Sequence, residues 1–237
     1  MNKVTDYTTD ILIAGAGMVG SAMALAAASL GYQVVLLEPQ PLLTKIPQRS
    51  NGINDFDLRV SALTKSSTRL LSQLGVWSEL ENDAQPYRRM DVWDNRGGGR
   101  IVFDADEVFQ QDLGVIIENR RVTAALHQQI NLTTNIRMIP DRLQSCQEIA
   151  EGVELTTAAG QVLSCRLFLG VDGAHSVSRR LLALPTREWD YGQQAIVATV
   201  KTARPHQRIA YQQFLSSGPV ALLPLKDAES TERYCSL

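Results

Sequence analysis

The sequence predicts a mixed α/β protein in which an α/β domain is interleaved with a second domain made mostly of β-sheet. Three observations support this fold class. Residues 10–39 follow the pattern strand, turn, helix, strand, which is typical of a parallel strand pair joined by a helix. Residues 88–105 and 136–171 alternate as short strands do. Residues 194–225 contain three further strand-like runs.

The composition bounds the class of protein. The 237 residues are 44% hydrophobic and 20% charged, which supplies enough apolar side chains for a sizeable core. The formal net charge is −2 and no basic run is present, so we expect no nucleic-acid partner. The three cysteines form no CxxC pair. That spacing argues against a disulfide framework and a structural zinc site, and it favours a reducing compartment.

The sequence also bears on localisation. The opening residues, MNKVTDYTTD, hold no apolar signal core. No apolar run approaches the ~18–20 residues that a membrane-spanning helix needs. We therefore expect a cytoplasmic protein, and contact with a membrane surface stays open.

The clearest segment is DILIAGAGMVGSAMALAAASLGYQVVLLEP, residues 10–39. Ile11–Ala14 are predicted to form a short apolar strand and Val34–Leu37 a second one. Between them, Met18–Leu30 are small, helix-forming residues without proline, and Gly31 is placed to stop that helix. The three elements make one βαβ unit with a parallel strand pair.

The middle of the chain is predicted from breakers and periodicity. Residues 39–57 contain three prolines and several turn formers, which predicts a long loop. Residues 63–81 predict a helix that stops near Gly75, with one apolar face formed by Leu70, Leu71, Leu74 and Trp77. Residues 88–105 alternate about a glycine turn and predict a hairpin, and residues 119–130 predict a further helix.

The remainder is predicted to be rich in strands. Residues 136–171 predict short strands, with a hairpin at TTAAGQVL and a buried strand over Leu167–Val171. A short helix is expected at 175–182. The runs QAIVATVKT, IAYQQFL and PVALLPL, within residues 194–225, predict three strands of the second domain.

Residues 15–20 match the pattern G-x-G-x-x-G between a predicted strand and a predicted helix. The first glycine permits a tight turn, the second lets the backbone approach a pyrophosphate, and the third lets helix and strand pack closely. Phosphates favour a helix N-terminus because its N–H groups and dipole attract negative charge. The candidate dinucleotide loop is therefore Gly15, Ala16, Gly17, Met18, Val19 and Gly20.

Glu38 ends the second strand, 18 residues after Gly20. An acid at this place accepts hydrogen bonds from a ribose hydroxyl pair and repels a 2′-phosphate. The first site would thus take FAD or NAD and reject NADP. The alternative is a closely packed glycine turn that binds nothing, with Glu38 as an ordinary exposed acid.

Three further polar residues have two interpretations each. Arg59 follows a polar loop and is either a solvated side chain or a ligand contact. Asn119 opens a predicted helix and is either an N-cap or part of a site. Asp172 follows a predicted buried strand, where a charge costs stability unless something uses it. It is either a cap or turn former for the helix at 175–182, or a binding residue.

Taken together, these residues resemble a known family, the FAD-dependent aromatic hydroxylases of the para-hydroxybenzoate hydroxylase fold. The resemblance is carried by the GxGxxG motif, Glu38, Arg59, Asn119 and a DGxxSxxR motif made of Asp172, Gly173, Ser176 and Arg179. Five stretches are similar to its ubiquinone-biosynthesis branch, the 2-polyprenylphenol hydroxylases: RVSALTKSSTRLLSQLGVW, PYRRMDVWD, VIIENRRV, WDYGQQAIVATV and GPVALLPL. The resemblance covers nearly all of residues 9–237.

The resemblance implies a role for each of these polar residues. Asp172 would accept hydrogen bonds from FAD near its ribityl–pyrophosphate stretch, and Gly173 would let the backbone come close. The same Asp-Gly pair is implicated in binding the reduced nicotinamide cofactor. Arg59 would reach the pyrophosphate side of FAD and Asn119 the flavin end.

The resemblance also implies the reaction. NAD(P)H reduces FAD, and one oxygen atom of dioxygen is then delivered to the electron-rich ring of a polyprenylphenol. Because the cofactor carries the difficult step, no catalytic side chain is assigned. No metal is expected either, since His127, His175 and His206 lack metal-ligand spacing. The substrate would lie against the sheet near residues 192–225. Its long tail is compatible with peripheral contact at the inner membrane face and with other ubiquinone-biosynthesis proteins as partners.

The chain departs from the family at one point. The family's third FAD motif, GDAAHxxxPxxGxGxN, would lie beyond residue 237 and is absent here. We therefore expect a chain truncated at its C-terminal end, with weakened FAD affinity and no activity by itself. The expected domains are an FAD-binding, Rossmann-like domain over 1–80 and 100–190, and a partial β-sheet substrate domain over 81–99 and 191–237.

Two other functions compete with this interpretation. One is a different FAD-dependent oxidoreductase of the same fold, such as a prenyl reductase or an amine oxidase, which the glycine motif fits equally well. The other is a non-catalytic dinucleotide-binding module, in line with the absent third motif. The DGxxSxxR motif and the five similar stretches favour the hydroxylase.

Overall fold

A computed structural model describes residues 9–48 and 52–237, which form two compact units. Unit 1 comprises the described residues up to Lys45 together with Thr123–Asp190, and unit 2 comprises Ile46–Val122 together with Tyr191–Leu237. Each unit is thus built from two separate stretches of the chain. The predicted fold class, an α/β domain interleaved with a β-sheet domain, is confirmed.

Unit 1 is built on one six-stranded sheet. Its strands are β1 (Thr9–Ala14), β2 (Val34–Leu37), β8 (Ile136–Ile139), β9 (Leu143–Ile149), β10 (Gly152–Thr157) and β11 (Val162–Gly170). Their order is β8-β2-β1-β11-β10-β9. The first four are parallel, while β10 and β9 continue the sheet as antiparallel strands. The carboxyl ends of four parallel strands therefore meet at one edge.

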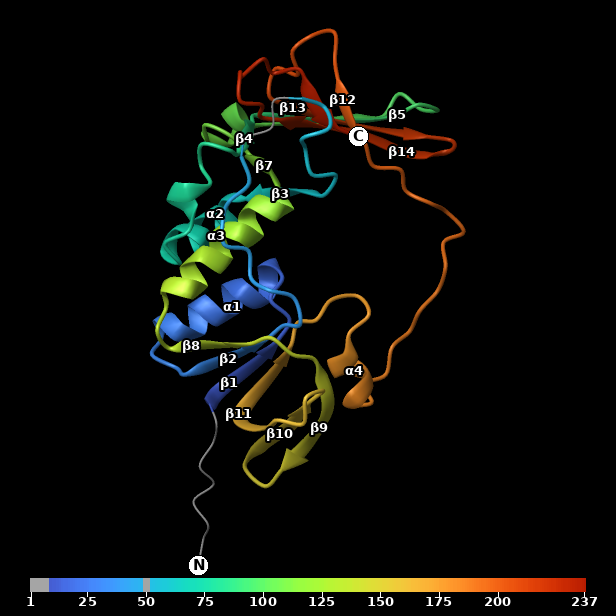
Figure 1. The fold of residues 1–237 in the computed structure, drawn as a ribbon. Helices are drawn as coiled ribbons and strands as arrows, with labels where there is room; N and C mark the ends of the chain where they lie inside the picture. Colours follow the sequence, from blue (N-terminus) through green and yellow to red (C-terminus); the bar gives the residue numbers. More distant parts are fainter. Residues whose placement is uncertain (1–8, 49–51) are drawn as a thin grey trace, which may run out of the picture. The chain divides into compact units, whose positions relative to one another are not determined.

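Helices cover this sheet and close its core. The helix α1 (Met18–Ser29) packs on β1, β2 and β8 (Figure 1), and α4 (Val177–Leu181) packs on β9. Small residues such as Ala24 and Ala28 bury the inner face of α1, which lets the helix lie close to the strands. The core beside β10 and β11 consists of Leu12, Val35, Leu37, Ile139, Leu155, Leu163 and Cys165.

Unit 2 contains two sheets. Its strands are β3 (Val60–Thr64), β4 (Gln85–Tyr87), β5 (Arg89–Asp94), β6 (Arg100–Asp104), β7 (Gly114–Glu118), β12 (Thr199–Lys201), β13 (Ile209–Leu215), β14 (Gly218–Leu225) and β15 (Tyr234–Ser236). The larger sheet has the order β12-β15-β14-β13-β5-β6, and the smaller has β3-β7-β4. The two sheets enclose a core of Phe56, Tyr87, Ile116, Ala210, Leu225 and Tyr234.

Unit 2 also carries the remaining helices. These are α2 (Lys65–Gln73) and the short 3₁₀ helices η1 (Trp77–Glu79) and η2 (Ala105–Val108). The helix α3 (Asn119–Leu132) begins in unit 2, and its residues from Thr123 onward belong to unit 1.

Most predicted elements are confirmed. The βαβ unit forms as β1, α1 and β2, and Gly31 follows α1 with φ +89. The hairpin at 88–105 forms as β5 and β6, and the hairpin at TTAAGQVL joins β10 to β11. The helix at 119–130 is α3. The predicted loop at 39–57 holds no helix or strand among its described residues, and residues 49–51 lie outside them.

Three predicted elements were wrong in extent. The helix at 63–81 is divided: Val60–Thr64 pair with β7 as a strand, α2 ends at Gln73, and Gly75 turns the chain with φ +73. Leu70 is consequently 44% exposed rather than part of a buried face. In the run at 194–202 only β12 forms a strand.

The strand before Asp172 also differs from the prediction. It ends at Gly170, and Leu167 near its end is 48% exposed. The buried part of β11 lies earlier, at Leu163 and Cys165, which pack into the core between β10 and β1. The end of the strand is therefore not buried, and the expectation that a charge at Asp172 must be used because it follows a buried strand does not hold.

The expected domain limits stay a prediction, because compact units report packing and not which residues hold a ligand. Residues 46–80 and 100–122, which the sequence placed with the FAD-binding domain, pack in unit 2. Within the described residues, no helix is long and apolar enough to cross a membrane.

Candidate functional site

Unit 1 contains a cavity of about 540 Å³ at the carboxyl ends of its parallel strands. Its lining comes from the segments that follow β1, β2, β8 and β11. In open α/β sheets, ligands bind at this edge because the strands end there and the connecting loops diverge. Five residues predicted from sequence line the cavity together: Gly15, Gly17, Glu38, Asp172 and Gly173.

The three motif glycines have three different physical requirements. Gly15 has φ +104, and a Cβ built on it would lie 2.5 Å from the carbonyl oxygen of Val171. A Cβ on Gly20 would lie 1.9 Å from the carbonyl oxygen of Gly15. Only glycine fits either place. Gly17 is different: a Cβ there would meet nothing within 4 Å, and the residue lines the cavity.

The start of α1 is suited to an anion. Gly17 is its N-cap residue and brings no side chain, so no side-chain hydrogen bond caps the helix. The first turn holds no acidic residue. Met18 is half-buried and Val19 is 61% exposed, so the first-turn backbone is accessible. Uncapped N–H groups at a helix N-terminus form a ready anion site.

Glu38 lies against the glycine loop. Its Oε2 accepts a hydrogen bond from the Ala16 N–H at 3.0 Å, and its Oε1 accepts one from the Gln40 N–H at 3.1 Å. The carboxylate therefore connects the end of β2 to the loop after β1. It also lines the cavity, and its contact with a ribose stays a prediction.

Asp172 is tied into the turn that leads to α4. Its Oδ2 accepts from the backbone N–H groups of Val177 at 2.7 Å and Ser178 at 2.9 Å, and its Oδ1 accepts from the Ser176 hydroxyl. Burial raises the pKa of Asp172, but these hydrogen bonds together outweigh burial and hold the pKa below its ordinary value. The N-cap residue of α4 is Ser176, so Asp172 acts as a turn former whose carboxylate also accepts from two N–H groups of the first helical turn.

Asp172 nevertheless also lines the cavity, beside Gly173 with φ +86. The two interpretations of this carboxylate are therefore compatible. It holds the turn with its inward hydrogen bonds while it faces the same space as Gly17 and Glu38. Its contact with FAD stays a prediction.

Arg59 and Asn119 belong to unit 2. The side chain of Arg59 is exposed, and its backbone N–H donates to Asp57 Oδ1 at 3.1 Å. The Asn119 N–H donates to the Arg59 carbonyl oxygen at 2.9 Å, and Asn119 Oδ1 accepts from the Ser61 hydroxyl at 2.6 Å. The Asn119 side chain therefore bonds to β3. At the start of α3, Asp57 Oδ2 accepts a hydrogen bond from the Arg120 N–H at 3.3 Å.

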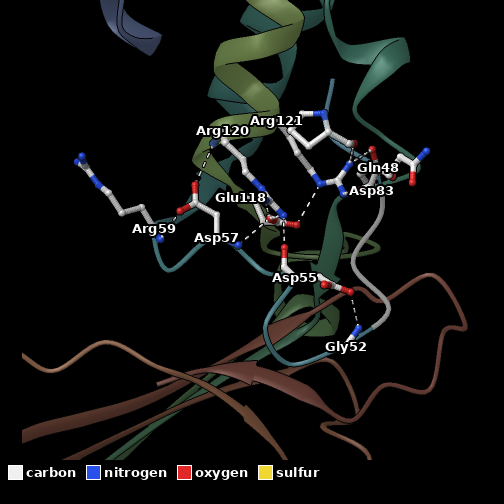
Figure 2. Close-up of polar contacts among 10 residues, drawn as sticks. Gln48, Gly52, Asp55, Asp57, Arg59, Asp83, Glu118, Arg120 and Arg121 are labelled. Carbon is white, nitrogen blue, oxygen red and sulfur yellow. Dashed lines mark hydrogen bonds and ion pairs between the residues drawn. The ribbon is translucent and has the colours of Figure 1, made fainter. Parts of the chain in front are cut away.

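A charged cluster holds the loop that carries Arg59. Arg121, whose side chain is 3% exposed, donates to Glu118 Oε1 at 3.0 Å and to Asp83 Oδ2 at 2.8 Å. It also donates to the carbonyl oxygens of Pro47, at 2.9 Å, and Gln48. Figure 2 shows these partners converging on one guanidinium. A buried arginine is tolerated because its acceptors surround it.

Arg120 completes this cluster from the other side. Its Nε donates to Glu118 Oε2 at 2.7 Å, and its guanidinium also donates to the Asp55 carbonyl oxygen. Glu118 Oε2 in turn accepts from the Asp57 N–H at 2.9 Å. The loop before β3 is therefore fastened to the start of α3 at several points, and the sequence alone did not indicate this cluster.

One whole lining segment was missed in the sequence, namely Asp141, Arg142 and Leu143, which follow β8. The Thr157 hydroxyl, with the N–H groups of Ala159 and Arg142, holds the pKa of Asp141 below its ordinary value. The signal that could have found them is the strand at 136–139. Had its parallel pairing with β2 been recognised, its carboxyl end would have been placed at the cavity.

The chemistry available in this cavity is that of binding. It offers uncapped backbone N–H groups, acceptor carboxylates and one arginine. Asp141 and Asp172 both have lowered pKa values, so both are ionised near neutral pH and neither is suited to donate a proton. Phosphates fit the helix start and hydroxyl groups fit the carboxylates.

Comparison with known proteins agrees with this geometry. Residues 8–237 match the model of a family described as FAD binding domain. The chain is 34% identical over 240 residues to the mitochondrial ubiquinone biosynthesis monooxygenase COQ6 of Danio rerio, over 94% of this chain and 48% of that protein. It is 32% identical over 229 residues to the 3-demethoxyubiquinol 3-hydroxylase of Escherichia coli K12, over 94% of this chain and 56% of that protein.

The solved structures show the same fold. PqsL of Pseudomonas aeruginosa, a probable FAD-dependent monooxygenase, superposes with a TM-score of 0.74 at 21% sequence identity. The match covers 96% of this chain and 59% of PqsL. The chain spans about half the length of the curated relatives that it matches.

Proposed function

The chain belongs to the FAD binding domain family, and we propose on that basis that it binds FAD and hydroxylates the aromatic ring of a polyprenylated phenol in ubiquinone biosynthesis. NAD(P)H is the proposed reductant and dioxygen the proposed source of oxygen. The names of the Danio rerio and Escherichia coli relatives support the substrate class, since both refer to ubiquinone or ubiquinol.

One observation carries the proposal: three separate segments of unit 1 bring five predicted residues, Gly15, Gly17, Glu38, Asp172 and Gly173, into a single cavity. The helix start at Gly17 is open where a pyrophosphate would lie, and Glu38 stands beside it where a ribose would lie. A side chain at Gly17 would occupy the space that a cofactor needs. The residues present therefore fit a dinucleotide.

We assign the roles as follows. The loop Gly15–Gly20 binds the pyrophosphate through its backbone N–H groups, and Glu38 accepts hydrogen bonds from the ribose hydroxyls. Asp172 and Gly173 approach the ribityl–pyrophosphate stretch from β11. Arg59 and Asn119, held together in unit 2, act on the pyrophosphate side and the flavin end respectively.

FAD, when bound, supplies the redox chemistry with NAD(P)H and dioxygen. The part played by this chain is to bind and to position. The glycine loop offers N–H donors to the phosphates, and Glu38 selects a ribose without a 2′-phosphate because its charge repels one. No side chain of the described residues is assigned the role of acid or base.

The cofactor assignment is tested by titrating the protein with FAD and following the quenching of flavin fluorescence. We expect saturable binding with one site. ADP should compete, because the cavity is built for the phosphates and the ribose of the ADP half. FMN, which lacks the adenosine, should compete much more weakly. Absence of saturable FAD binding, or equal competition by FMN and ADP, would refute the assignment.

The reaction is tested separately, with NAD(P)H oxidation and product mass as readouts. A polyprenylated phenol should stimulate NAD(P)H oxidation and gain one oxygen atom. Reduction of the prenyl chain without added oxygen would instead identify a prenyl reductase. If NAD(P)H is oxidised at the same rate with and without a polyprenylated phenol, the hydroxylase assignment is refuted.

We also propose that the protein is cytoplasmic. It would make peripheral contact with the inner membrane face and with other ubiquinone-biosynthesis proteins. The support is the long apolar tail of the proposed substrate, which resides in lipid. Co-sedimentation with lipid vesicles that contain a polyprenylphenol tests the membrane contact. Equal sedimentation with and without vesicles would refute it.

A further inference from the structure

A buried histidine joins two loops beside the cavity. His127 lies on α3 within unit 1 and is 5% exposed. Its Nε2 is 2.7 Å from the carbonyl oxygen of Ala16, in the glycine loop. Its Nδ1 is 2.9 Å from the backbone nitrogen of Leu43, in the segment that follows Glu38. From the sequence, this residue was weighed only as a metal ligand.

The two contacts determine the protonation state of the ring. The Leu43 N–H can only donate, so Nδ1 accepts and carries no proton. The carbonyl oxygen of Ala16 can only accept, so Nε2 carries the proton and donates it. The ring is therefore the neutral Nε2–H tautomer, and both nitrogens are used.

Both backbone polar groups of Ala16, which belong to the two peptide groups that flank its Cα, are held by hydrogen bonds. Its N–H donates to Glu38 Oε2 at 3.0 Å. Its carbonyl oxygen accepts from His127 and, at 2.9 Å, from the Ser21 hydroxyl. Because the next peptide bond is trans and planar, the N–H of Gly17 must point opposite to this carbonyl. Fixing the Ala16 carbonyl toward α3 thus fixes the Gly17 N–H away from it.

Two consecutive residues of α3 hold the second loop. Leu43 bonds to His127, and the carbonyl oxygen of Thr44 accepts from the Gln128 side chain at 3.2 Å. This segment continues from Glu38 and Pro39, which line the cavity. One ring therefore connects the loop after β1 to the loop after β2.

We propose that His127 is a positioning residue for the cofactor, which orients the Gly17 N–H toward the phosphates by holding the Ala16 carbonyl oxygen. This proposal rests on the proposed FAD site. The bond to Leu43 has a separate task, which is to keep the segment after Glu38 in place. The two ring nitrogens thus have distinguishable roles.

Two near-isosteric variants separate these roles. The side-chain amide of His127→Asn lies near the position of Nδ1, so it can accept from Leu43 but does not reach Ala16. The amide of His127→Gln lies near the position of Nε2, so it can donate to Ala16 but no longer accepts from Leu43. FAD affinity by fluorescence titration and amide hydrogen exchange at Leu43 are measured for both variants.

The expected result is a crossed pattern. His127→Asn should weaken FAD binding by about two- to tenfold, as expected for one lost hydrogen bond, with slow exchange retained at Leu43. His127→Gln should bind FAD nearly as the unmodified protein does, with faster exchange at Leu43. Equal FAD affinities of the two variants, whether weakened or unchanged, would overturn the proposal.

His206 provides a matched control in unit 2. It is also 5% exposed, its Nδ1 accepts from the Arg208 N–H at 3.1 Å, and its Nε2 is 3.2 Å from the Leu225 carbonyl oxygen. His206→Asn and His206→Gln remove the corresponding bonds in unit 2, at a position with no assigned contact to FAD. They should change the melting temperature and leave FAD affinity within twofold. Equal loss of FAD affinity in the His206 variants would show that buried histidines act only through stability.

A failure of the proposed function is distinguishable from a failure of this inference. If the unmodified protein does not bind FAD while ¹⁵N shifts show His127 as the Nε2–H tautomer, the FAD assignment falls and the positioning role falls with it. If the unmodified protein binds FAD and the two His127 variants do not differ, only the positioning role falls.

Discussion

The backbone N–H of Asn119 donates to the carbonyl oxygen of Arg59 at 2.9 Å, which joins the start of α3 to the loop before β3. The two residues were selected from sequence as separate contacts to one cofactor. In the structure they form one unit, since a backbone bond fixes the position of each relative to the other. The charged cluster of Glu118, Arg120 and Arg121 also fastens this loop to the start of α3 (Figure 2).

The first prediction concerns Arg121. Arg121→Leu removes a buried guanidinium that serves two carboxylates and two carbonyl oxygens. We expect the free energy of unfolding to fall by about 3 kcal/mol or more, because buried carboxylates lose a charged partner. Arg121→Lys should recover only part of this loss, because the compact lysine ammonium cannot donate to all the acceptors that the planar guanidinium reaches. Denaturant unfolding gives both values.

Arg137→Leu is the control for Arg121, because Arg137 is exposed on β8. It should change the free energy of unfolding by less than ~0.5 kcal/mol. Similar losses in the Arg121 and Arg137 variants would contradict the importance of the buried cluster.

The second prediction concerns Gly17. Gly17→Val places a side chain in open space that lines the cavity, so the protein should fold normally and lose FAD binding. Circular dichroism and FAD titration measure the two properties. Gly20→Val is the contrasting variant: its Cβ would lie 1.9 Å from the Gly15 carbonyl oxygen, so it should fail to fold. Normal FAD binding by Gly17→Val would place the phosphates elsewhere.

The third prediction concerns Glu38. Glu38→Ala removes the proposed acceptor of the ribose hydroxyls, and hydrogen bonds to a charged group contribute ~1.5–3 kcal/mol. FAD affinity should therefore fall roughly tenfold or more. Glu148→Ala, on the exposed face of β9, serves as the control and should leave FAD affinity unchanged. Unchanged FAD retention by Glu38→Ala would remove Glu38 from the site.

The fourth prediction concerns Asp172. Asp172→Asn leaves one acceptor oxygen where two serve the turn, so the melting temperature should fall. If Asp172 also contacts FAD, flavin binding should weaken more than stability alone explains. Ser176→Ala is the matched variant, because it disturbs the same turn without changing a cavity-lining residue. Equal FAD affinities of the Asn and Ala variants would leave Asp172 as a turn former only.

The lowered pKa of Asp172 gives this prediction a pH dependence. A carboxyl whose folded pKa lies below the unfolded value of ~3.9 stabilises the fold above that value. Its contribution is lost as the pH falls through the folded pKa. The stability difference between the unmodified protein and Asp172→Asn should therefore be constant above about pH 5 and shrink below about pH 4. A difference that grows in acid would contradict the assignment.

Local patterns in the sequence were sufficient for the βαβ unit, the hairpin at 88–105, the tight turn at Gly15 and the close packing at Gly20. Each of these depends on neighbouring residues: a strand or helix period, a turn glycine, or a backbone angle that a Cβ forbids. The family resemblance rested on the same short motifs. Asp172 does line the cavity, although the strand end before it is not buried as predicted, and its contact with FAD stays a prediction.

Other features depended on contacts between distant segments. The pairing of β8 with β2 brings Asp141 to the cavity, the pairing of β3 with β7 shortens the predicted helix at 63–81, and His127 bonds to Ala16 and Leu43. The donors and acceptors can be identified from the sequence, but which of them form hydrogen bonds with one another cannot. That choice is made when the whole chain packs, because buried polar groups must find partners wherever the fold brings them together.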